Sequence, residues 1–292
     1  MEKRRLWQRP RLRTDEEQGL ERKATWLELF YDLVFVVVIA ELAHTLSKDI
    51  NPAGIATFGF LFIPVWWVWI GVTFYDERFE TGDISHRLLM FLQMIPVAAM
   101  SLFAHDALGE GSQGFALAYA GARTLLIMLL LRAGWYVKPY RPISNRSAIG
   151  SCISIALFIL SVFFPPPLRF VLWGIGLFID LLHPLLTMQY FATLPRFSST
   201  RLPERFGLFT IIVLGESIAG AISGVARNPE ASGVGITALL ALALASGVGR
   251  FISTLWLEDL QSLEFCPLHR WLPGGPLHGE LRWLISGAVS FY

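Results

Sequence analysis

TWLELFYDLVFVVVIAELAHTL, residues Thr25–Leu46, decides the fold class of this chain. It is long enough to cross a bilayer as a helix, and its middle, residues 33–40, is wholly apolar. Yet the stretch also carries three carboxylates and a histidine. An ionisable group near the centre of a bilayer costs roughly 2.5–3.5 kcal/mol on the insertion scale. A simple anchor has no need of them, so the stretch predicts a membrane protein with a polar interior.

The composition of the whole chain supports this reading. Of its 292 residues, 54% are hydrophobic and only 16% are charged, whereas soluble domains have about 25% charged residues. The two cysteines, Cys152 and Cys266, do not indicate a disulfide framework. We found no nucleotide-binding glycine fingerprint, no CxxC and no HExxH, so we expect no enzyme, no cofactor, no metal and no nucleic-acid partner.

Hydropathy predicts an all-α transmembrane helix bundle of about eight spans joined by short loops. We expect three regions: a basic tail (1–23), a membrane domain (24–262) and a Pro/Gly-rich tail (263–292). The predicted spans are Thr25–Leu46, Gly54–Tyr75, Ser85–Ala107, Gly114–Val137, Ala148–Phe164, Leu168–Phe191, Glu204–Ala226 and Val234–Leu257.

Charge predicts the orientation. With the N-terminus in the cytoplasm, the inside segments hold 17 Lys and Arg residues, while the outside loops hold three: Lys48, Arg169 and Arg227. This bias follows the positive-inside rule. We therefore expect a multi-pass protein of the bacterial cell membrane whose first partner is the lipid bilayer.

Three stretches together resemble one family. They are WLELFYDLVFVVVIAEL (Trp26–Leu42), DERFETGDISHRLLMFLQM (Asp76–Met94) and PERFGLFTIIVLGESI (Pro203–Ile218), with a weaker match in LWLEDL near residue 257. This sequence is identified as a member of the bacterial low temperature requirement A (LtrA) family.

The resemblance implies an integral membrane protein of a family named for a growth defect in the cold, with no settled molecular activity. It also implies a polar signature at Glu28, Asp32, Asp76, Arg78, Asp83, Arg87, Glu204, Arg205 and Glu216. Family members usually continue through further spans, whereas this sequence becomes Pro/Gly-rich after about Glu264. That difference predicts a shortened or divergent end.

The polar residues within the spans are the candidate site. Glu28 and Asp32 are four residues apart, so they share a helical face. They are either an interfacial pair in hydrated head groups or a carboxylate pair that faces a polar cavity. Arg123 lies near the middle of its span and needs a carboxylate partner, for which Asp180 and Glu216 are the candidates.

Two readings remain open for the Arg123, Asp180 and Glu216 set: a structural clamp, or a clamp that also forms a transport site. His183 is either a helix–helix hydrogen-bonding residue or part of a proton relay. Arg250 is a second deeply placed positive charge, in the eighth span.

The charged loop after the second span predicts a capping network on the cytoplasmic side, with a gate or ligand site as the alternative. Its members would be Asp76, Arg78, Asp83, Arg87, Glu204 and Arg205. Two functions from different classes follow. One is transport of protons, ions or a small solute through the polar interior. The other is a non-transporting scaffold or sensor in cold or envelope stress.

Overall fold

The computed structural model describes residues 9–12, 25–48, 52–80, 83–191, 205–213 and 215. Contacts divide the chain into two units, residues 1–197 with 277–292 and residues 198–276. Of the described residues, 205–213 and 215 belong to the second unit and are helical. The first unit contains these elements in order: β1 (Arg11–Leu12), α2 (Trp26–Lys48), α3 (Pro52–Arg78), β2 (Phe79–Glu80), α4 (Ile84–Ala104), α5 (Ser112–Tyr136), η1 (Lys138–Tyr140), α6 (Arg141–Ser161) and α7 (Leu168–Phe191).

In its described residues, the first unit is a helix bundle with one pair of two-residue strands. In the described part of the chain, five helical stretches are long and apolar enough to cross a membrane: Trp26–Leu46, Pro52–Arg78, Ile84–Ala104, Ser112–Tyr136 and Lys138–Ser161. In addition, α7 has the bounds of the sixth predicted span, and its 24 residues give a helix about 36 Å long. The prediction of a helical protein with several candidate spans is confirmed.

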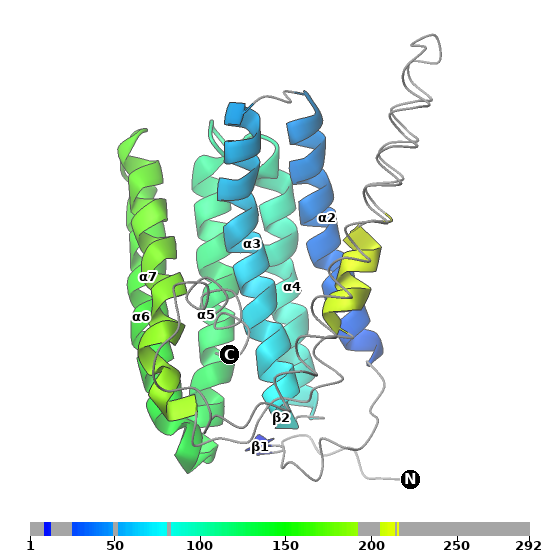
Figure 1. The fold of residues 1–292 in the computed structure, drawn as a ribbon, viewed down its shortest axis with the longest axis vertical. Coiled ribbons are helices and arrows are strands. Elements are labelled where there is room, and N and C mark those ends of the chain that lie inside the picture. Colours follow the sequence, from blue (N-terminus) through cyan, green and yellow to red (C-terminus); the bar gives the residue numbers. More distant parts are fainter. Residues whose placement is uncertain are drawn as a thin grey trace, which may run out of the picture. The chain divides into compact units, whose positions relative to one another are not determined.

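Helix α5 is the centre of this bundle. It packs against α3, α4 and α6, while α2 packs on α3 and α4, and α7 packs on α6 (Figure 1). Several of its buried residues are small and lie on more than one side of the helix, which lets the neighbouring helices approach closely. These buried small residues are Ala116, Ala118, Ala120, Ala122, Ala133 and Gly134.

Helix α6 faces its neighbours with a stripe of buried serines. Successive serines are three, four, three and seven residues apart, which keeps them on one helical face: Ser144, Ser147, Ser151, Ser154 and Ser161. The Ser144 hydroxyl donates to the Leu130 carbonyl of α5 at 2.7 Å, and the Trp173 indole of α7 donates to Ser161 at 2.8 Å. Serines therefore link α6 to both neighbours.

The outer surface of the bundle reverses the usual pattern of a soluble protein. On α4 the exposed side chains include Leu88, Leu92, Ile95 and Leu102, while Gln93 of the same helix is completely buried. A row of exposed leucine and isoleucine side chains is unfavourable in water but fits a lipid surface. Polar groups inside and apolar groups outside are what the opening stretch predicted.

One predicted loop is partly helical and another is wholly helical. We expected residues 75–83 to form a polar loop, but α3 continues to Arg78 and is followed by β2. Its last charged residues are buried against neighbouring elements, and these contacts outweigh their polarity. We also expected a basic loop from Lys138 to Arg146, but η1 and then α6 begin there. Proline occupies a first-turn position in both, where its missing N–H costs nothing.

Candidate functional site

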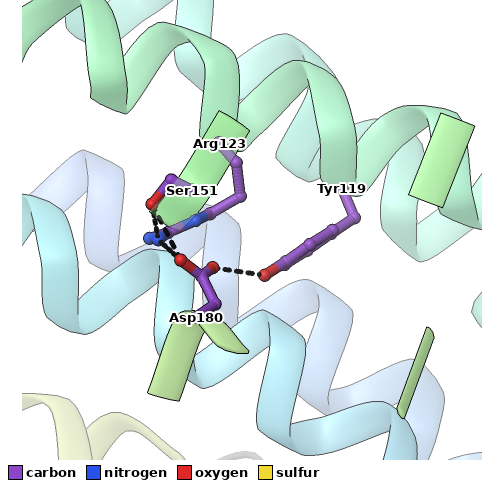
Figure 2. Close-up of polar contacts among 4 residues, drawn as sticks. All are labelled: Tyr119, Arg123, Ser151 and Asp180. Carbon is purple, nitrogen blue, oxygen red and sulfur yellow. Dashed lines mark hydrogen bonds and ion pairs between the residues drawn. The ribbon is translucent and has the colours of Figure 1, made fainter. Parts of the chain in front are cut away.

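The centre of the bundle holds a four-residue polar network, which we call the central network: Tyr119, Arg123, Ser151 and Asp180. Tyr119 and Arg123 are one helical turn apart on α5, Ser151 comes from α6, and Asp180 comes from α7 (Figure 2). All four lie in the middle part of their helices. The network therefore joins three helices at mid-length.

Asp180 is the acceptor of this network. Its Oδ1 accepts from Arg123 Nη2 at 2.5 Å and from the Ser151 hydroxyl at 2.7 Å. Its Oδ2 accepts from the Tyr119 hydroxyl at 3.0 Å. The same Nη2 of Arg123 lies 2.7 Å from Ser151 Oγ, so the serine bridges the ion pair. The structure thus pairs Arg123 with one of the two carboxylates that the sequence offered.

Burial makes this ion pair energetically important. Arg123 is 1% exposed and Asp180 is 0% exposed. A buried charge pair gains its stability only when the geometry is good and further hydrogen bonds satisfy the remaining groups. Here Ser151 and Tyr119 supply such bonds to the carboxylate. The arrangement holds opposite charges as a neutral unit, and adding a proton or a cation at Asp180 would upset that balance.

Two glycines make room for the network. A Cβ added to Gly71 of α3 would overlap Leu126 Cδ2 and lie 3.5 Å from Arg123 Nη1. The side of the α3 backbone that lacks a side chain at Gly71 therefore faces Leu126 and the Arg123 guanidinium. At Gly150 of α6, an added Cβ would meet the His183 ring at 3.0 Å. His183 is buried, one turn after Asp180, and packs in the space that Gly150 leaves.

A second carboxylate lies between α2 and α3. Asp32 is 1% exposed, and its Oδ1 accepts from the Trp69 indole at 2.7 Å. Glu28, one turn earlier, is also buried, and its backbone N–H donates to the Thr25 hydroxyl at 3.3 Å. The expected shared face of Glu28 and Asp32 is thus turned inward. The sequence did not single out Trp69 as the donor, because it stands in a cluster of tryptophans that also fits an interfacial position.

A third polar group lies where α3 ends and α4 begins, which we call the β end because β1 and β2 lie there (Figure 1). Arg132 Nη2 of α5 lies 2.7 Å from Asp83 Oδ2, and His86 Nε2 lies 3.2 Å from Asp76 Oδ1. The Ser85 hydroxyl also donates to Asp83.

Arg78 is buried at this end, whereas Arg87 is exposed. The predicted network missed Arg132 and His86. Arg132 had counted only toward the charge bias, although it is nine residues after Arg123 on the same helix.

The other predicted site residues lie elsewhere. Arg205 is buried in the helical residues of the second unit. Glu204, Glu216 and Arg250 lie outside the described residues. Within the ranges that the structure covers, there is no group of three or more His, Cys, Asp or Glu residues placed to hold a metal ion.

Comparison with known proteins gives three findings. The family model described as "Bacterial low temperature requirement A protein (LtrA)" matches residues 23–256. The chain is 33% identical over 234 residues to an uncharacterized protein of Rhizobium meliloti (strain 1021), an alignment that covers 75% of this chain and 55% of that protein. The chain thus spans about half the length of this curated relative. No solved structure matches the chain.

Proposed function

The chain belongs to the bacterial low temperature requirement A (LtrA) family of membrane proteins, and from this premise we propose that it moves protons or small cations through the polar interior of its helix bundle. We further propose that the bilayer it occupies is the bacterial cytoplasmic membrane, with the N-terminus inside. Both proposals go beyond family membership, because membership of this family does not assign a molecular activity.

The observation that supports transport most strongly is the Arg123–Asp180 pair. Ionisable residues within membrane helices are costly, and they commonly mark ion or proton pathways. Neutral polar side chains could hold three helices together with less desolvation. Keeping a full charge pair at mid-helix is therefore more readily explained by a working role for the charges than by packing alone.

The proposed working step is a competition for Asp180. A proton or a cation that reaches its carboxylate weakens the attraction to Arg123, because the carboxylate charge is then neutralised or shared. Ser151 and Tyr119 are placed to hold the carboxylate while its partner changes. Asp32, with its indole donor, is the second carboxylate at which the same ion could stop. The driving force would be a gradient of the ion across the membrane.

Flux through the purified full chain tests the proposal. Proteoliposomes containing pyranine report proton entry after a pH jump, and Na⁺- and K⁺-sensitive dyes report the cations. We expect wild-type flux above protein-free liposomes and at least a tenfold loss in Asp180→Asn. Glu110→Gln, which changes an exposed carboxylate in the turn before α5, is the matched control and should retain full flux. Equal flux in Asp180→Asn and wild type would end the proposal.

A second candidate function is a non-transporting scaffold or sensor in cold or envelope stress. The observation in its favour is that both oxygens of Asp180 already accept hydrogen bonds from neighbouring side chains. On this reading Asp180→Asn lowers the melting temperature in detergent, and no variant or wild type shows flux. The two functions are thus separated by flux in the wild-type protein alone.

A further inference from the structure

Part of the basic N-terminal tail is bound to the bundle. Arg11 and Leu12 form β1, which pairs antiparallel with β2 so that Arg11 is opposite Glu80 and Leu12 is opposite Phe79. Pro10 is buried. The Arg9 guanidinium lies over the Tyr136 ring, 5.9 Å from its centroid. The sequence alone explained these basic residues as a topology signal, which requires no contact with the bundle.

The contacts of residues 9–12 connect two separate elements. Through β2 they continue the end of α3, and through Tyr136 they reach the end of α5. These are the ends that carry Asp76 on α3 and, one turn before Tyr136, Arg132 on α5. Residues 9–12 therefore lie at the β end, against the ends of α3 and α5 that carry one member of each ion pair.

The two ion pairs at this end are well buried. The side chains of Asp83 and Asp76 are 0% and 5% exposed, and those of Arg132 and His86 are 9% and 7% exposed. Aromatic rings also pack at this end of the bundle. Phe79 of β2 is in edge contact with Tyr140 at 4.8 Å, and Tyr75 stacks on His86 at 5.7 Å.

The attachment of residues 9–12 to the bundle is weak. Two residue pairs supply few backbone hydrogen bonds, and isolated two-stranded pairings are marginal in water. The cation–π contact of Arg9 with the Tyr136 ring adds only a modest attraction. Such an attachment can open and close without unfolding a helix.

We propose that residues 9–12 are a strap that closes the β end over the Asp83–Arg132 and Asp76–His86 pairs, and that release of the strap admits water and ions to them. On the proposed orientation this is the cytoplasmic end. The strap is a regulator of the transport pathway, and this regulatory half rests on the proposed function. The closure itself does not, because it can be measured without flux.

A disulfide lock tests the strap. Directly opposed antiparallel residues have Cα atoms about 4.5–5.5 Å apart, within the range that a disulfide spans. We would introduce Arg11→Cys with Glu80→Cys into a chain with Cys152→Ser and Cys266→Ser. The control pair is Arg11→Cys with Glu110→Cys, since Glu110 precedes α5 and Tyr136 ends it. We expect oxidation in membrane vesicles to cross-link the first pair and not the second. Failure of the first pair to cross-link overturns the strap.

Two readouts on the same protein then separate the strap from the transport proposal. Proton flux by pyranine should fall at least fivefold on oxidation and return with dithiothreitol, whereas Leu12→Asp, which weakens the strap without cysteines, should raise it. Flux that is the same in locked and reduced protein overturns the regulatory role.

If no variant and no wild type carries flux, the transport proposal has failed, and amide hydrogen exchange of residues 75–80 in nanodiscs decides the closure. Slower exchange in the locked protein than in Leu12→Asp supports a closing strap, and equal exchange overturns it.

Discussion

Helix α5 carries two arginines nine residues apart, and their surroundings differ. Arg123 lies at mid-helix, where Asp180, Ser151 and Tyr119 enclose it and α3 approaches at Gly71. Arg132 lies near the end of α5, where it pairs with Asp83 beside the strap. On the proposed strap, opening lets water reach the second pair, whereas α6 and α7 contact the first pair and α3 approaches it. Breaking the arginine–aspartate pair should therefore cost more stability at mid-helix than at the β end.

The largest expected effect is at the centre. Asp180→Asn leaves Arg123 buried without its counter-charge, which should destabilise the protein by about 3–5 kcal/mol. Thermal unfolding in detergent or lipid nanodiscs, followed by intrinsic tryptophan fluorescence, measures the loss. The double variant Arg123→Gln with Asp180→Asn should recover part of it, because no unpaired charge remains. A double variant that is as unstable as the sum of both single ones would contradict a direct pair.

At the β end the effect should be smaller. Arg132→Gln removes one charged hydrogen bond, worth about 1.5–3 kcal/mol, and water can solvate Asp83 after a local opening. A double-mutant cycle with Asp83→Asn, read by the same unfolding assay, gives the coupling energy. If the Arg132–Asp83 coupling energy equals or exceeds the Arg123–Asp180 coupling energy, the central pair is not the more costly one to break.

Gly71→Ala tests how closely α3 approaches the central pair. The new methyl group would overlap the Leu126 side chain and press toward Arg123, so we expect overpacking to lower the free energy of unfolding by about 1–3 kcal/mol. Gly59→Ala on the same helix is the control, because nothing lies within 4 Å of its added Cβ. That control should be neutral or slightly stabilising, since alanine favours helix. An equal response at both glycines would mean that α3 does not close the central network.

The smallest expected effects concern single neutral donors. Trp69→Phe removes the indole bond to Asp32, and Tyr119→Phe removes the hydroxyl bond to Asp180, each at a cost of about 0.5–1.5 kcal/mol. Both retain their aromatic rings, so packing changes little. Stability and flux measured together rank the two carboxylates. A greater loss of flux in Trp69→Phe than in Tyr119→Phe would make Asp32, and not Asp180, the main ion site.

Much of the bundle could be predicted from hydropathy. The first, fourth and sixth predicted spans differ from the ends of α2, α5 and α7 by two residues or fewer. The larger differences are the start of α6, which lies seven residues before its predicted position, and the ends of α3, α4 and α6, which differ by three residues each. Two of these, the end of α3 and the start of α6, are charged segments. There the polar residues suggested loops, but contacts with other elements and first-turn prolines support helix. Hydropathy reports where a helix is apolar and does not report which charges a neighbour will cover.

The sequence by itself determined that the chain enters a membrane, to which family it belongs, and that Arg123 needs a carboxylate. These follow from composition, from local patterns and from the cost of an unpaired charge in lipid. Only the tertiary structure decided that Asp180 is a partner, that Ser151 and Tyr119 join it, and that residues 9–12 pair with β2. Helical periodicity assigns a residue to a face, but the partner on the opposite face comes from another helix, and packing alone selects it.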